Sequence, residues 1–151
     1  MINRRTRHHA ACILLLAVIA GASLTSAQAQ LSRTPAVGSA ERKAILDVLR
    51  ARSERDLKQK VIFEVTLLKV SGDWAAARVT PMRPEGGAID YSKTSYKELV
   101  AEGVFDGEGE ALLQRKSGNW ALVKWRFGAS DTELSMWIEE LGAPKSLNQA
   151  D

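Results

Sequence analysis

Apolar residues recur at helical spacing between residues 45 and 57, with charged residues between them. The positions of this stripe are Ile45, Val48, Leu49 and Leu57. Ser39 stands where a helix N-cap is expected, and Glu41 places a negative charge in the first turn, where the helix dipole favours it. The pattern predicts an amphipathic helix over residues 40–58.

Four runs rich in β-branched and aromatic residues predict strands. They span residues 61–70, 74–80, 110–116 and 120–127. Alternation in the first run places Val61, Phe63, Val65 and Leu67 on one side, with Ile62, Glu64, Thr66 and Leu68 on the other. Gly72-Asp73 joins the first two runs, and Gly118-Asn119 joins the last two, so each pair is expected to form a hairpin. The repeated Ser-Gly-(Asp/Asn)-Trp-Ala, at 71–75 and 117–121, is interpreted as shared turn chemistry, because the match outside the turns is too poor for an internal duplication.

Shorter helices are predicted outside the hairpins. Residues 95–98 fit a capping box that opens a helix ending at Gly103, within an irregular excursion over residues 81–109. Ser130 and Glu133 fit a second capping box. The apolar positions of the closing helix are Leu134, Trp137, Ile138 and Leu141. Gly142 and Pro144 end it.

These elements predict an α+β domain over residues 39–144, with a four-stranded antiparallel sheet formed by two hairpins and packed with an N-terminal and a C-terminal helix. The helices are expected to cover one face of the sheet. Residues 30–38 are expected to form a flexible leader, and residues 145–151 a frayed tail.

The first 29 residues have the pattern of a secretory signal peptide. Arg4, Arg5 and Arg7 precede an apolar run from about residue 10 to 22, and the small residues Ala27 and Ala29 fit a signal peptidase site. The apolar run is shorter than the ~20 residues that span a bilayer. We therefore expect cleavage after Ala29, export to the periplasm or the medium, and no stable membrane anchor.

Cleavage changes what the composition allows. The whole chain has 21 basic and 18 acidic residues, and the three arginines of the signal leave the mature chain with no net charge. No basic stripe with interleaved aromatics remains, so nucleic acid is not expected as a partner. Cys12, His8 and His9 also lie in the signal. The mature chain thus lacks the side chains of cysteine nucleophiles, Ser-His-Asp triads and Cys/His metal sites, and we predict no metal and no cofactor.

The order of elements resembles cystatin-like and nuclear-transport-factor-2-like domains, in which a helix packs into a curved antiparallel sheet. The segments Gly72-Asp73-Trp74-Ala75 and 111–120 (Ala-Leu-Leu-Gln-Arg-Lys-Ser-Gly-Asn-Trp) are similar to those of small exported bacterial proteins of unassigned function. The likeness consists of turn and core residues and so concerns the fold. Residues 59–63 lack the glycine of the cystatin inhibitory loop, so protease inhibition is not transferred. An enzyme of the transport-factor-like kind, which often uses Asp with His or Tyr, would here be limited to Asp and Tyr.

Candidate ligand-binding residues cluster in the irregular excursion. They are Asp90, Tyr91, Lys93 and Tyr96, joined by Trp120 on the last strand. Loops of this kind often carry recognition, although ordinary turn chemistry explains the same residues. Alternation places Trp120 and Trp125 on opposite faces, so that one is exposed, and Trp137 in the core. The acidic residues Asp106, Glu108 and Glu110 lack the remaining ligands of a calcium loop and are expected to be solvated.

The residues favour a non-enzymatic binding or interaction module of the cell envelope, with a protein or small ligand as its partner. Its expected contact surface is the excursion at 84–109 with the exposed face of the sheet. Two alternatives remain: a small pocket enzyme using Asp90 with Tyr91 or Tyr96, and a structural envelope protein.

Overall fold

The computed structural model describes residues 31–128 and 133–149. The α-helices are α1 (Ala40–Leu57), α2 (Lys97–Ala101) and α3 (Leu134–Glu140). The strands are β1 (Ile62–Ser71), β2 (Trp74–Met82), β3 (Gly109–Lys116) and β4 (Asn119–Phe127). Two 3₁₀ turns, η1 (Tyr91–Lys93) and η2 (Lys145–Asn148), complete the described elements. The predicted α+β class is confirmed, and the predicted helix and strands are displaced by two residues or fewer at their ends.

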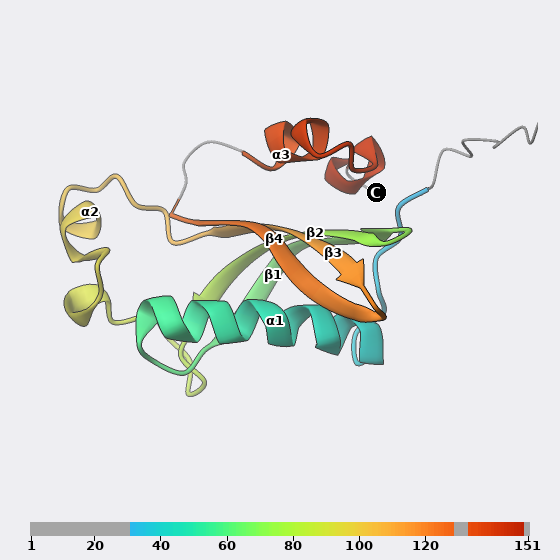
Figure 1. The fold of residues 1–151 in the computed structure, drawn as a ribbon. Coiled ribbons are helices and arrows are strands. Elements are labelled where there is room, and N and C mark those ends of the chain that lie inside the picture. Colours follow the sequence, from blue (N-terminus) through green and yellow to red (C-terminus); the bar gives the residue numbers. More distant parts are fainter. Residues whose placement is uncertain (1–30, 129–132, 150–151) are drawn as a thin grey trace, which may run out of the picture.

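The sheet is antiparallel, open and ordered β1-β2-β3-β4. Helix α1 runs beneath it, α3 lies above it, and α2 stands at one end (Figure 1). The expectation that the helices cover one face is therefore wrong. Two inner strands with apolar residues on both faces explain the difference: Ala75 and Ala77 face α1, whereas Ala76 and Leu112 pack with α3.

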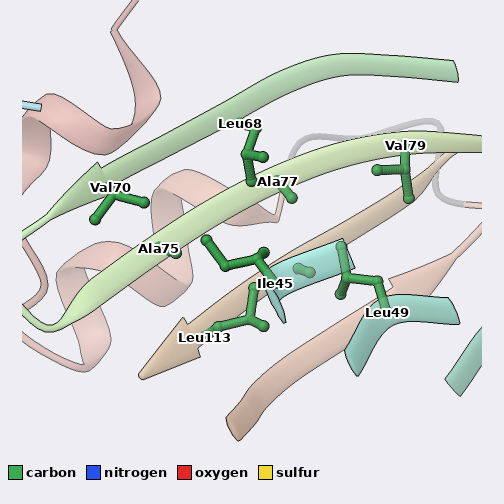
Figure 2. Packing of buried hydrophobic residues seen from close by; sticks show 9 residues of the cluster. Ile45, Leu49, Leu68, Val70, Ala75, Ala77, Val79 and Leu113 are labelled. Atoms are coloured by element: carbon green, nitrogen blue, oxygen red, sulfur yellow. The ribbon is translucent and has the colours of Figure 1, made fainter. Parts of the chain in front are cut away.

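The main core lies between α1 and the sheet. Ile45 and Leu49 of α1 are fully buried and project toward side chains of β1, β2 and β3 (Figure 2). Their partners include Leu68, Val79 and Leu113. Burying one such aliphatic side chain contributes about 1.5–3 kcal/mol, so this layer fixes the helix against the sheet.

Each outer strand contains one extra residue, and each changes a side-chain assignment. The register of β1 shifts between Val65 and Leu67, so Leu67 faces α3 and Leu68 faces α1, the reverse of the predicted alternation. The register of β4 shifts opposite Leu112 and Leu113, which leaves Val123 unpaired with β3. A β-bulge of this kind shifts the alternation by one residue.

The β4 bulge also makes the predicted orientation of two tryptophans wrong. Trp120 and Trp125 lie on the same side of the sheet, packed against the α1-face core, although simple alternation predicts opposite sides. Both are partly buried. Trp137 is buried at 7 % exposure in the α3-face core, as predicted.

The two similar hairpin sequences form turns that are one residue out of step. In the first hairpin Ser71 pairs with Trp74, so Gly72-Asp73 is the loop, with positive φ at Gly72. In the second, Lys116 pairs with Asn119, and the loop is residues 117–118, both with positive φ. The repeated motif thus uses related turn residues in different registers, which argues against a duplicated unit.

The ends of the shorter helices differ from the predicted capping boxes. Helix α2 begins at Lys97, with Tyr96 at the N-cap, and α3 has Glu133 at the N-cap; neither cap makes a side-chain hydrogen bond. Ser130, the expected partner of Glu133, lies outside the described residues. By contrast, Ser39 caps α1 as predicted, its Oγ accepting from the Arg42 amide at 3.2 Å.

The segments flanking the domain are attached to it where they are described. Arg33 pairs with Val70 as an isolated antiparallel bridge, and Leu147 of η2 is fully buried against the α3-face core. The signal residues, Ala27 and Ala29 included, lie outside the described residues. Across residues 31–128 and 133–149, no helix has the length and apolar character that crossing a membrane requires.

Candidate functional site

The candidate site lies where the excursion folds back over the C-terminal end of α1. Gln59, just after the helix, donates from its amide to the Asp90 carbonyl at 2.9 Å, and its Oε1 accepts from the Asp90 amide at 3.2 Å. This two-bond clamp fixes the start of η1. The Asp90 carboxylate accepts from the Ser92 amide at 3.0 Å and so caps the 3₁₀ turn.

Behind this clamp the two tyrosines enter an aromatic cluster with Phe105, Phe127 and Trp125. The Tyr91 and Phe105 rings meet edge to face with centroids 5.1 Å apart, and Tyr96 and Phe127 do the same at 5.1 Å. Trp125 stacks on Phe127 at 6.1 Å. Such pairs contribute about 0.5–1.5 kcal/mol beyond burial, so the cluster gives the excursion a rigid base.

In front of the aromatic cluster is a hollow of about 420 Å³, here called the excursion cavity. Its apolar lining includes Met82, Ala88, Ile89, Tyr91, Val100 and Phe105. Asp106 is the charged residue of the lining, and Thr80 adds a hydroxyl. The size and the mainly apolar walls with few polar groups are those of pockets that hold small ligands or single side chains.

A glycine brings the excursion close to the tyrosine that lines the cavity. A Cβ at Gly107 would lie 3.1 Å from the Tyr91 hydroxyl oxygen, and the residue has φ +75°, a conformation that side chains disfavour. Glycine therefore allows the backbone to pass against the phenol. Exposed apolar side chains continue from the cavity along α2 and its end: Leu99 (43 %), Val100 (38 %) and Val104 (58 %).

The pKa values of Asp90, Tyr91 and Tyr96 are shifted in directions that do not favour proton transfer near neutral pH. Burial raises the pKa of Tyr91, and the nearby Asp106 raises it further. Burial likewise raises the pKa of Tyr96. The hydrogen bonds from Ser92 lower the pKa of Asp90, helped by Lys93. A general acid or base works best with a pKa near the working pH, and these groups are shifted away from it.

The structure brings together only part of the predicted set. Asp90, Tyr91 and Tyr96 are neighbours, and Lys93 is exposed beside them at the end of η1. Trp120 lies near the β3–β4 turn, at the other end of the sheet from α2, where the Arg115 guanidinium stacks 4.5 Å from its ring. Trp120 therefore does not belong to this site.

Sequence reasoning missed the other half of the aromatic cluster. Phe105 precedes the glycine-rich turn at residues 107–109, and Phe127 ends a strand, so neither is distinguished in the sequence from an ordinary core residue. Only tertiary folding places them against the tyrosines. The position of Phe127 also depends on the bulge at Val123, which the sequence does not signal.

The acidic run after the excursion forms separate contacts. Asp106 accepts from the Glu108 amide at 3.0 Å, and Glu108 accepts from the Thr66 hydroxyl at 3.0 Å. Glu110 is buried at 3 % exposure, so the expectation that all three carboxylates are solvated is wrong for it. In the part of the chain that is described, no three His, Cys, Asp or Glu residues are grouped to hold a metal ion.

Comparison with known proteins found no relative of this chain. The chain matches no family model, no curated protein and no solved structure.

Proposed function

We propose that the chain is an exported, non-enzymatic binding module, a member of the helix-and-curved-sheet group that includes cystatin-like and nuclear-transport-factor-2-like domains. The excursion cavity is its contact site for an apolar group, either a small ligand or a side chain of an envelope partner. The observation that carries the proposal is this cavity of about 420 Å³ with mainly apolar walls. The apolar run and Ala-x-Ala site ahead of residue 30 support export.

The interior arrangement favours binding at the surface over catalysis in a central pocket. The space between α1 and the sheet, where a transport-factor-like enzyme would hold its substrate, is occupied by Ile45, Leu49 and Leu113, all fully buried. Asp90 is engaged as a cap, with its pKa lowered. An Asp90→Asn variant keeps an oxygen for the Ser92 amide, so we expect it to bind like the native protein.

Binding at the cavity can be measured with N-phenyl-1-naphthylamine, a neutral fluorophore that brightens in apolar surroundings. We expect a saturable rise in fluorescence with the mature protein. Ala88→Phe fills the mouth of the cavity and should weaken the affinity by about tenfold, the loss expected when roughly 1.4 kcal/mol of contact is removed. Ala51→Phe, at an exposed position on α1, is the matched control. Identical titrations for both variants would refute the site.

Export is tested separately. The mass of the protein isolated from the envelope fraction should be that of a chain beginning at Gln30. A chain that retains residues 1–29 would overturn this part of the proposal.

A further inference from the structure

A second hollow runs beside the outer edge of β1, with a volume of about 720 Å³. It contacts five consecutive strand residues, Val65 to Lys69. Successive side chains of a strand point to opposite faces, so a hollow that touches all five follows the edge of the sheet. We call it the β1-edge groove. The five residues extend over roughly 13 Å at the usual rise of a strand.

This edge already pairs with one residue of the leader. The Arg33 amide donates to the Val70 carbonyl at 2.9 Å, and the Val70 amide donates to the Arg33 carbonyl at 2.8 Å. Continued in this antiparallel register, Pro35 falls opposite Leu68. Proline has no N–H, so it cannot continue the ladder, and the leader leaves the edge there.

The next position along the edge is left open. Residues two apart in a strand direct their backbone N–H and C=O groups to the same side. The backbone groups of Leu68 therefore point to the outer edge of the sheet, as those of Val70 do, while its side chain packs toward α1. Within the described residues, no hydrogen bond from outside the sheet reaches the Leu68 backbone. An exposed edge of this kind is a template for a further strand.

The charges that line the groove favour an acidic occupant. Arg42 and Arg78 contribute two cations, and Glu108 contributes one carboxylate. Lys69 also lines the groove, but it is buried at 4 % exposure and has an interaction of its own, so its charge is not counted here. Arg78 is held by Glu110 at 2.7 Å, but no carboxylate of the described residues lies within ion-pair distance of Arg42, which makes only a 3.4 Å contact to the Pro35 carbonyl. Arg42 belongs to α1, so it marks the α1 side of the groove as the side for a negative charge.

We propose that the β1-edge groove binds a short extended peptide segment by strand addition, and that this segment carries carboxylates on the side chains that face α1. The backbone of β1 supplies hydrogen bonds that do not depend on sequence, as in other strand additions. The Arg42 guanidinium supplies the preference for acid. Side chains on the other face of the added strand meet Arg78, Glu108 and Asn148, a mixed surface that tolerates neutral polar residues.

Fluorescence anisotropy with three labelled octapeptides tests the charge preference. The peptides alternate Thr with Glu, with Gln or with Lys. The Glu peptide should bind tightest, and Arg42→Gln should weaken it by about fivefold, the upper range for one partly exposed ion pair. Arg55→Gln, at an exposed position of the same helix, is the matched control and should leave the affinity unchanged.

N-methylation tests the strand addition without altering the protein. Methylating the amides of the Glu residues, or those of the Thr residues, removes the donors on one side of the added strand only. One of the two methylated peptides should lose about tenfold in affinity, because the N–H groups that face β1 are lost, while the other binds normally.

Equal affinity for the three peptides, or binding that survives both methylations, would overturn the proposal. A dimer of this chain that excludes the Glu peptide would overturn it as well. Ala88→Phe should leave peptide binding unchanged, so failure at the β1-edge groove is distinguishable from failure at the excursion cavity.

Discussion

The buried carboxylate of Glu110 offers the sharpest test of how α3 is attached to the sheet. Its Oε1 accepts from Arg78 Nε at 2.7 Å, and its Oε2 accepts from the Leu134 amide at 3.1 Å. Arg78 in turn donates to the Asn148 side chain at 3.0 Å. One carboxylate thus ties β2, β3, α3 and η2 together.

The cost of Glu110→Ala follows from these contacts. Removing one member of a buried ion pair typically costs about 3–5 kcal/mol, because the other charge stays behind without a partner. The Arg78 side chain is 23 % exposed and can regain some water, so we expect the lower end, about 3 kcal/mol. Glu110→Gln keeps an acceptor and should cost about 1–2 kcal/mol.

Urea unfolding of the mature protein, followed by far-ultraviolet circular dichroism, measures these differences. Glu140→Ala is the control, since its pair with Lys124 at 3.1 Å is exposed and should be worth less than about 1 kcal/mol. The double variant Arg78→Met/Glu110→Leu removes both charges and should regain most of the stability. A loss below about 1 kcal/mol for Glu110→Ala would refute the reasoning, because the attachment would then not depend on this pair.

Three further changes test other parts of the structure. Ser53→Ala removes a hydroxyl that is 1 % exposed and has no hydrogen-bond partner among the described residues, so urea unfolding should show a gain of about 0.5–1 kcal/mol; a loss would contradict that. Gly109→Ala builds a Cβ into the Trp125 ring, and a loss of about 1–3 kcal/mol with altered tryptophan fluorescence is expected, whereas an unchanged spectrum would oppose it. The hydrogen bond from Arg33 lowers the pKa of Glu41 below its ordinary 4.5. The stabilisation that the ionised Glu41 adds is therefore complete above that pH, and it is lost as the pH falls through the pKa that Glu41 has in the folded protein. The gap between native protein and Glu41→Gln should therefore be constant from pH 7 to about 5 and narrow below it, and a constant gap down to pH 3 would count against this pairing.

The first helix and the four strands were predictable from the sequence because helix caps, apolar spacing and turn residues are set by residues close together in the chain. The stripe that includes Ile45 and Leu49 and the cap at Ser39 located α1, and the glycines of the two turns located both hairpins. The covering of both faces was not predictable in the same way. It depends on Ala76 and Leu112, which look like ordinary strand residues until a second helix is placed over them.

The site was predicted only in outline for a related reason. Asp90, Tyr91 and Tyr96 were found because polar and aromatic residues crowd one irregular segment. Phe105 and Phe127 gave no such signal, and Trp120 was included although it lies at the other end of the sheet. An extra residue in β4 has no marker in the amino-acid sequence, yet it decides which way every later side chain of that strand points.

The bulges in β1 and β4 also bear on how the protein avoids uncontrolled self-assembly. Fibrils grow when long, flat strands stack without interruption, copy upon copy. Here the ladder of each border strand is broken near its middle, and β4 further carries Lys124 and Arg126. The interruptions oppose the unbroken backbone pairing from copy to copy that a fibril needs, while the β1 edge keeps room for a short peptide segment.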